Sequence, residues 1–244
     1  MKPSSSLIWK IRLPNRNVPV VLVRMIVGNI YSSNVPGRPC SNRPKTPVPH
    51  QIMRNPLKKL LFHHEHVCPW WVCFTFDNFL RKLLHNSEEI LRPYVVEGNT
   101  VLDIGPGMGY FSIPLARTVG ETGKVIAADI QPEMLRVLQK RAKKAGVEKR
   151  IITHLCKADS LGLDIQFDFI LAFWMVHEVP NPLALFEEIK SLLKPSGKFL
   201  FAEPVLHVNQ AMYEKTIKTA ELAGLVMKEK PKISLSRSAL FTTI

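Results

Sequence analysis

The sequence predicts an α/β fold in which helices cover both faces of a mostly parallel sheet and an antiparallel hairpin closes the C-terminal end. Short apolar runs alternate with longer amphipathic stretches from about residue 100 onward, a pattern typical of strands alternating with helices. The first run leads directly into a glycine-rich turn at 105–109. The last two apolar runs follow one another with no helical stretch between them, which favours antiparallel pairing.

Strands are expected where an apolar run is too short for a helix and is bounded by glycine, proline or polar residues. These runs are 100–104, 124–129, 151–156, 167–173 and 198–202. Helices are expected near 110–118, 131–145, 181–193 and 209–223. The strands of the closing hairpin are expected at 225–233 and 236–243. Because helices separate most of the first five strands, these strands are expected to run parallel.

The segment between Phe62 and the first strand predicts an N-terminal helical cover. Apolar residues recur there at helical spacing, and the stripe comprises Phe79 or Leu80, Leu83, Leu84, Ile90 and Leu91. Asn86 or Ser87 is expected to cap the turn that precedes Glu88, because a short polar side chain accepts a hydrogen bond from the first turn of a helix.

Residues 1–55 are expected to form a basic, Pro/Ser-rich, mostly disordered extension, dispensable for folding, ahead of one domain over 56–244. Residues 1–59 hold eleven of the 33 Lys and Arg residues and no acid. Three interpretations stay open: an Arg-rich targeting segment, a basic arm that contacts a polyanion, or sequence upstream of a true start at Met53. Residues 60–244 hold 22 basic and 20 acidic residues, so the folded domain is not expected to bind nucleic acid.

Hydropathy and cysteine content indicate the compartment. No apolar run reaches the roughly 18 residues that a membrane-spanning helix needs, so no transmembrane segment is expected. The four cysteines are scattered through a chain of 244 residues, a length that supports a hydrophobic core without disulfides. The expectation is therefore a cytoplasmic protein.

The sharpest motif is VLDIGPGMGYF at 101–111, between an expected strand and an expected helix. Gly105, Gly107 and Gly109 let the backbone turn tightly and let a ligand approach where a side chain would collide, although a tight turn alone is the alternative. Asp103 ends the strand, at the edge where open α/β sheets bind ligands. The dinucleotide fingerprint G-x-G-x-x-G would need glycine where the sequence has Tyr110.

The order D-x-G-x-G-x-G instead resembles motif I of class I S-adenosylmethionine-dependent methyltransferases, and within them the small-molecule group similar to ubiquinone and menaquinone biosynthesis enzymes. The resemblance covers about residues 60–244. It implies a Rossmann-like, doubly wound, seven-stranded sheet, S-adenosyl-L-methionine as cofactor and a small-molecule methyl acceptor. It also implies that Asp103 faces the ammonium group of the cofactor. Pro106, between the first two glycines, departs from the commoner small residue or cysteine.

Five further residues are expected at the cofactor. Asp129 ends the second strand, where a carboxylate can accept hydrogen bonds from both ribose hydroxyls. The resemblance implies that Ile130 packs on the adenine and that Asp159, with Ser160 beside it, accepts from the adenine amino group. A helix N-cap is the alternative for Asp159. Phe173 ends the fourth strand and is expected beneath the cofactor.

Methyl transfer from a sulfonium needs alignment in a dry pocket more than it needs catalytic side chains. The candidate general base is His177, with Glu178 beside it, just past the fourth strand. The alternative is that His177 only hydrogen-bonds a loop or closes the cofactor pocket. Trp174 and Met175 are expected to line a pocket or the core.

Donor groups that suit zinc or iron gather in one segment, which holds His63, His64, His66, Cys68 and Cys73. Their spacing matches no closed structural site, and Trp70 and Trp71 favour a packed lid, so no metal is expected. Asp77 is expected either to cap the helix that follows it or to contact the cofactor.

Several rival functions remain open. A nucleic-acid methyltransferase is disfavoured because the fourth strand ends in AFWM, without an Asn- or Asp-Pro-Pro-Tyr motif. A protein methyltransferase stays possible, as does a non-catalytic module that keeps the cofactor fold. NAD-dependent redox chemistry is disfavoured by the spacing of the glycines.

Overall fold

The computed structural model describes residues 85–243. The predictions for residues 1–55, for the histidine and cysteine cluster at 63–73, for Asp77 and for the first part of the helical cover lie outside this range. Within the described range, no helix is long and apolar enough to cross a membrane.

The described residues build one seven-stranded sheet with the order β3-β2-β1-β4-β5-β7-β6. Its strands are β1 (Thr100–Ile104), β2 (Lys124–Asp129), β3 (Ile151–Leu155), β4 (Phe167–Phe173), β5 (Leu193–Pro204), β6 (Val226–Glu229) and β7 (Ser236–Thr242). The first five pair in parallel, whereas β7 is antiparallel to both β5 and β6. The predicted doubly wound, mostly parallel sheet with an antiparallel C-terminal hairpin is confirmed.

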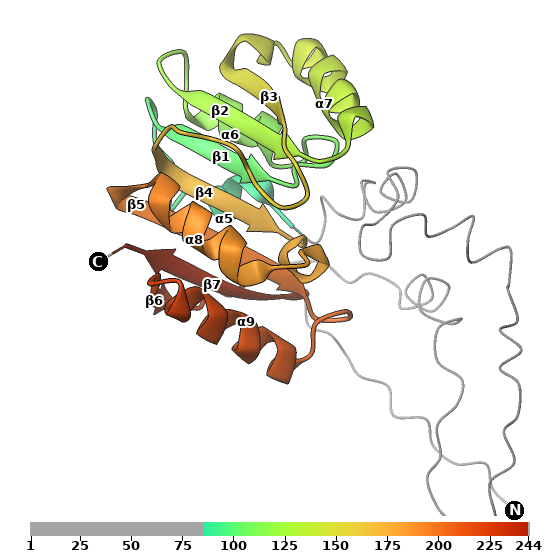
Figure 1. Ribbon diagram of the computed structural model, residues 1–244. Coiled ribbons are helices and arrows are strands. Elements are labelled where there is room, and N and C mark those ends of the chain that lie inside the picture. Colours follow the sequence, from blue (N-terminus) through green and yellow to red (C-terminus); the bar gives the residue numbers. More distant parts are fainter. Residues whose placement is uncertain (1–84, 244) are drawn as a thin grey trace, which may run out of the picture. The chain divides into compact units, whose positions relative to one another are not determined.

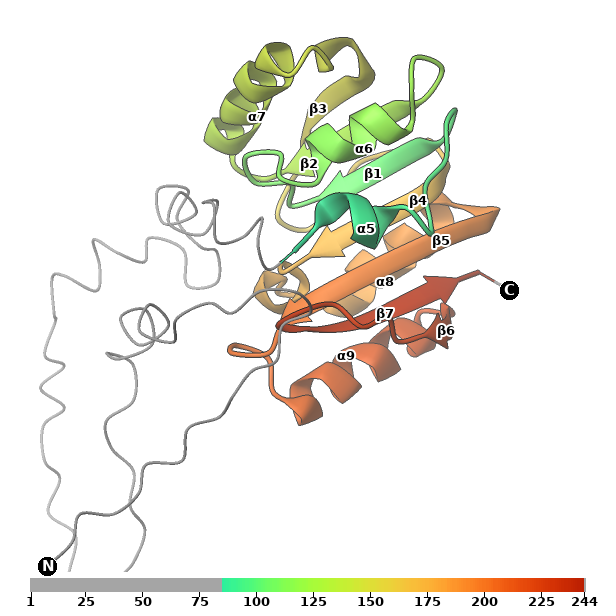
Figure 2. The same cartoon turned by 180° about the vertical axis from the view of Figure 1, so that it is seen from behind.

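Helices cover both faces of this sheet. They are α5 (Ser87–Leu91), α6 (Ser112–Thr118), α7 (Pro132–Lys144), α8 (Pro182–Leu192) and α9 (Gln210–Leu222), with short 3-10 helices η1 (Glu148–Arg150) and η2 (Val176–Glu178). Helices α8 and α9 lie in front of the sheet in Figure 1, whereas α5 and α6 lie in front in the reversed view of Figure 2.

Each face of the sheet has its own hydrophobic core. Leu102 of β1 packs with the apolar side of α8 and α9, which includes Phe186 and Ile217. The neighbouring Val101 packs on the other face with Leu115 of α6 and Leu138 of α7. Burial on both faces requires apolar residues at consecutive positions of the central strands, which is why these strands appear in the sequence as continuous apolar runs.

Asparagine side chains cap three of the helices. Asn86 accepts a hydrogen bond from the Glu89 backbone N–H at 3.4 Å, as predicted for the turn before Glu88. Asn181 and Asn209 cap α8 and α9 in the same way, and Pro182 follows Asn181 at the first helical position. Proline is favoured there because its missing N–H would have no partner within the helix.

Two strand boundaries differ from the prediction by more than two residues. β5 begins at Leu193 instead of 198, because Lys194–Gly197 form a bulge between the Phe167–Leu193 and Phe169–Lys198 pairs. β6 ends at Glu229 instead of 233. Pro231 follows shortly afterwards, and proline cannot donate the backbone hydrogen bond that would continue the ladder.

Candidate active site

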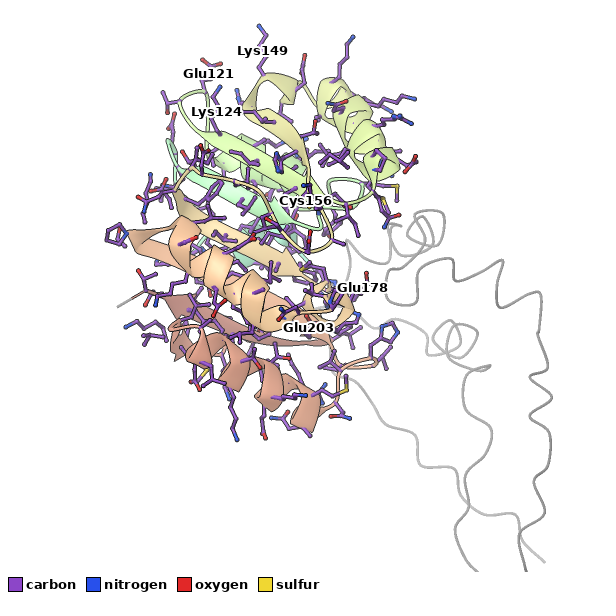
Figure 3. The ribbon with its side chains drawn as sticks, viewed as in Figure 1. Glu121, Lys124, Lys149, Cys156, Glu178 and Glu203 are labelled. Atoms are coloured by element: carbon purple, nitrogen blue, oxygen red, sulfur yellow. The ribbon has the colours of Figure 1, made fainter. Side chains whose placement is uncertain are left out.

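The parallel strands bring the predicted site residues to one edge of the sheet. Asp103, Asp129 and Phe173 lie at or next to the carboxyl ends of β1, β2 and β4, and Glu203 lies near the end of β5. Figure 3 labels Glu178 and Glu203 at this edge, and the backbone N–H of His177, the residue before Glu178, donates to Oε1 of Glu203 at 3.2 Å. Ligands of open α/β sheets bind there, so this edge is the candidate active site.

The loop after β1 needs glycine for two reasons: a left-handed backbone at all three positions, and a lack of space for a side chain at Gly105 and Gly109. Gly105 has φ +65°, and a Cβ added there would lie 3.1 Å from the Cβ and Cγ atoms of Met175. Gly107 has φ +54°, but an added Cβ would meet no atom of the described part of the chain within 4 Å. Gly109, with φ +87°, packs against Leu138. The loop is therefore fixed at both ends and open at its centre, at Gly107.

Asp103 lies at the base of this loop and is 1% exposed. Its Oδ2 accepts a hydrogen bond of 2.6 Å from the hydroxyl of Ser112, the first residue of α6. A carboxylate offers about four acceptor positions, so one such group can accept this bond and contact a cationic ligand as well.

Asp129 is the second buried carboxylate at this edge, with 7% of its surface exposed. Burial raises its pKa to about 6, although hydrogen bonds from the backbone of Gln131, Gly107 and Ile130 oppose the rise. The charge of Glu178 makes a smaller contribution to the same rise. The end of β2, the centre of the glycine loop and η2 therefore meet around this carboxyl group.

The predicted adenine-contacting residues lie beside the end of β2. Ile130 is 37% exposed, so its apolar side chain is accessible to a ligand at this edge. Asp159 lies in a turn between Lys157 and Ser160. No helix follows this turn before β4, so the alternative role of Asp159 as a helix N-cap is wrong. Ser160 Oγ accepts from the backbone N–H of Gly162 at 3.1 Å.

An aromatic cluster forms the apolar part of the edge. Phe173 is 5% exposed, its ring centroid lies 4.4 Å from that of Phe111, and His85 meets it edge-on at 5.2 Å. Trp174 has φ +61°, which is uncommon for any residue with a side chain. The Trp174 indole N–H donates to Ser236 Oγ at 2.9 Å and holds this conformation. Phe173 is therefore part of the packed apolar wall of the candidate site, whereas the neighbouring Trp174 is only partly buried.

The candidate base His177 is held by a residue that the sequence analysis missed. Its Nδ1 lies 2.5 Å from Oε2 of Glu203, and its backbone N–H donates to Oε1 of the same carboxylate at 3.2 Å. The Glu203 side chain is 1% exposed and that of His177 is 18% exposed. The ring of His207, also missed, lies edge-on to His177 at 5.9 Å. One signal was available, because Glu203 is an acid directly after the apolar run FLFA.

The described residues contain no group of three or more His, Cys, Asp or Glu side chains that could hold a metal ion. Cys156, beside the site, is not poised for thiolate chemistry, because burial raises its pKa to about 11 and the nearby charge of Asp129 adds to the rise.

A family model described as a methyltransferase domain matches residues 96–236, more than half of the chain. The chain belongs to this methyltransferase-domain family. The match spans the glycine loop, the ends of β2 and β4 and the His177–Glu203 pair. The predictions of an S-adenosylmethionine-dependent methyltransferase class and of its cofactor are confirmed at the level of the family.

Two relatives show where the sequence likeness lies. The ubiquinone/menaquinone biosynthesis C-methyltransferase UbiE of Hydrogenovibrio crunogenus is 34% identical over 107 residues, which are 43% of this chain and 42% of the relative. The demethylmenaquinone methyltransferase of Oceanobacillus iheyensis is 28% identical over 126 residues, 52% of this chain and 53% of the relative. The methyltransferase-domain chain thus spans about half the length of the curated relatives it matches.

Solved structures extend the likeness to the whole fold. A SAM-dependent methyltransferase from Aquifex aeolicus superposes with a TM-score of 0.67 at 25% identity, over 73% of this chain and 100% of that chain. A fibrillarin of Aeropyrum pernix, solved with natively bound S-adenosyl-L-methionine, superposes with a TM-score of 0.50 at 19% identity over 61% of this chain and 68% of that one. The fibrillarin likeness concerns the fold alone.

Proposed function

We propose that this chain binds S-adenosylmethionine at the carboxyl edge of its sheet and transfers the methyl group to a small-molecule acceptor. The observation that carries the proposal is the pair of buried carboxylates, Asp103 and Asp129, on either side of a glycine loop that is open at Gly107. This pair of hydrogen-bond acceptors suits a ligand that has an ammonium group and ribose hydroxyls but no phosphate. The pyrophosphate of a dinucleotide would instead be repelled by two carboxylates so close to the loop.

Each proposed cofactor residue has a role that its environment supports. Asp103 would hold the ammonium group, and Asp129 would accept from the ribose hydroxyls, because both are buried acceptors beside the loop. The exposed side chain of Ile130 would cover the adenine. Asp159 and Ser160, in the turn after β3, would accept from the adenine amino group.

Bound S-adenosylmethionine would supply a methyl group that a positively charged sulfur already activates. The protein must then align the acceptor and exclude water. Phe173 and Trp174 offer an apolar aromatic wall for that purpose. His177 would take the proton that the acceptor loses, and Glu178, whose charge reaches Asp129, would add negative potential around the cationic cofactor.

The names of the relatives support a narrower acceptor class. They include a ubiquinone/menaquinone biosynthesis C-methyltransferase and a demethylmenaquinone methyltransferase. A hydroxylated aromatic ring of the quinol type is therefore the first acceptor to test, and the cytoplasm is the proposed compartment.

The proposal is tested in two steps with the full chain. Isothermal titration calorimetry should show binding of S-adenosylmethionine and of its demethylated product, and no binding of NAD. Tight NAD binding without a response to S-adenosylmethionine would overturn the cofactor assignment.

In the second step, methyl-labelled S-adenosylmethionine is offered with a short-chain demethylmenaquinol, with other small hydroxylated aromatics, with bulk RNA and with protein. Label in RNA or protein, and in none of the small molecules, would overturn the small-molecule assignment.

A further inference from the structure

Glu203 is a buried acid whose position is explained by neither the core nor the cofactor site. It lies near the end of β5 and is 1% exposed, whereas acidic side chains are rarely buried without a partner. Both of its oxygens accept from His177, one from the ring and one from the backbone. Its cross-strand neighbour Arg237 instead donates to the carbonyl oxygens of Val205 and Val208.

We propose that Glu203 is a positioning residue that makes His177 a stronger base, so that the site selects acceptors whose nucleophile must lose a proton. This inference rests on the proposed methyl transfer. A carboxylate only accepts hydrogen bonds, so Nδ1 of His177 carries the hydrogen and Nε2 is the basic nitrogen. A carboxylate 2.5 Å from Nδ1 also stabilises the protonated ring.

During the proposed methyl transfer a positive charge forms on His177, and Glu203 would stabilise that charge. The acceptor's O–H, N–H or acidified C–H proton goes to Nε2, and the electron pair left behind forms the bond to the methyl carbon. The pair of the methyl–sulfur bond goes to sulfur, which loses its positive charge. One positive charge therefore disappears at the sulfur and one appears on His177, beside the buried carboxylate of Glu203. Thiolates and tertiary amines, which have no proton to lose, would gain nothing from this arrangement.

A purely structural role for Glu203 makes a different prediction. By accepting from the His177 backbone N–H, Glu203 also fixes η2 to the end of β5. The substitution Glu203→Gln keeps the shape and one acceptor oxygen, which can retain the bond from the His177 backbone N–H, but removes the charge beside the ring. A structural role would survive this change, whereas the proposed role would not.

The deciding measurement is the titration of His177 in the full chain, followed by the ring nitrogen signals in NMR and assigned with His177→Gln. In the wild type we expect the tautomer with hydrogen on Nδ1. In Glu203→Gln the affinity of His177 for a proton should fall at least about tenfold, since the partner charge is lost. Glu203→Asp, which keeps the charge on a shorter side chain, should fall between the two and serves as the second variant if the Gln variant unfolds.

Asp168→Asn is the matched control. Asp168 also accepts from a backbone N–H, that of Thr100, and pairs with Lys194 at 2.8 Å. It lies on β4 next to Thr100, the first residue of β1, at the opposite edge of the sheet. Neutralising this carboxylate should leave the His177 titration unchanged.

Turnover supplies a second test, once one of the small acceptors above accepts the methyl label. Glu203→Gln should lower kcat by about 10- to 100-fold and move the pH profile, while calorimetry finds the affinity for S-adenosylmethionine changed less than twofold. An unchanged His177 titration in both Glu203 variants would overturn the proposal, as would an unchanged pH profile. The NMR titration needs neither cofactor nor acceptor. If the His177 titration changes in the Glu203 variants but the chain transfers no methyl label, the proposed function is refuted and the pairing of His177 with Glu203 stands.

Discussion

Gly105 and Met175 lie in direct contact: a Cβ added to Gly105 would come within 3.1 Å of the Cβ and Cγ atoms of Met175. The loop after β1 and the loop after β4 are therefore packed on one another at the candidate site. Met175 follows Trp174, whose left-handed backbone is held by β7 through Ser236. The cofactor loop and the loop that carries His177 should thus respond together when either is changed.

The two glycine positions predict different consequences. Gly105→Ala combines a left-handed backbone with a close contact, so it should lower the free energy of unfolding by about 1–3 kcal/mol. Gly107→Ala has the strain of the left-handed backbone but no close contact, so it should lower the free energy of unfolding by only about 1 kcal/mol. Its new methyl group would enter the proposed cofactor space, so the affinity for S-adenosylmethionine should fall at least about tenfold. Urea unfolding and calorimetry measure the two effects.

Gly146→Ala is the control for the Gly107 variant. Gly146 has φ +69°, an added Cβ there meets no described atom within 4 Å, and it follows α7 instead of joining the site. It should show the same modest loss of stability with normal cofactor binding. Normal binding by Gly107→Ala as well would show that the open centre of the loop does not hold the cofactor.

Removal of the Asp129 carboxyl group should weaken cofactor binding. Asp129→Ala is expected to cost about 1.5–3 kcal/mol of S-adenosylmethionine binding energy, the usual value of hydrogen bonds to a charged group. Asp129→Asn keeps the shape and loses the charge, so it should fall between the wild type and the Ala variant. An affinity that neither variant changes would mean that the ribose is held elsewhere.

The same carboxyl group predicts a pH dependence of stability in the cofactor-free chain. Burial raises the Asp129 pKa to about 6, above the ordinary 3.8, so the folded state holds the proton more tightly than the unfolded state. This contribution is fully present below about pH 4 and is lost as the pH rises through about 6. From pH 5 to pH 8 the free energy of unfolding, measured with urea, should fall by about 1 kcal/mol more in the wild type than in Asp129→Asn. Equal slopes for the two chains would contradict the raised pKa.

The sheet was predictable where burial is two-sided. Both faces of β1, β2 and β4 are covered, so their residues form continuous apolar runs, and the predicted bounds agree with the structure. The start of β5 was not predictable, because Lys194–Gly197 have the composition of a turn but form a bulge against β4. A Cβ at Gly197 would lie 2.8 Å from the Phe167 carbonyl oxygen, a constraint that only the paired strands reveal.

The placement of the candidate site residues at one edge was predictable where each lies at or just after the end of its own strand. Asp103, Asp129 and His177 are found by reading the end of one strand at a time. Glu203 was missed because its role depends on a partner 26 residues away, across the pairing of β4 with β5. The N-cap alternative for Asp159 failed for a related reason, since a short turn in the sequence does not show whether a helix follows it.

Replacing His177 tests whether alignment alone accounts for the proposed methyl transfer. His177→Gln keeps a polar side chain of similar reach, so the fold and the affinity for S-adenosylmethionine should be preserved. If the acceptor loses its proton to the imidazole, turnover should fall about 10²- to 10⁴-fold, the usual cost of losing a general base. The wild-type rate should rise with pH as the His177 ring loses its proton, and this rise should be absent from the variant. Full turnover in His177→Gln would leave the ring a structural partner of Glu203, whereas weak cofactor binding with normal turnover at saturation would place it in the pocket wall.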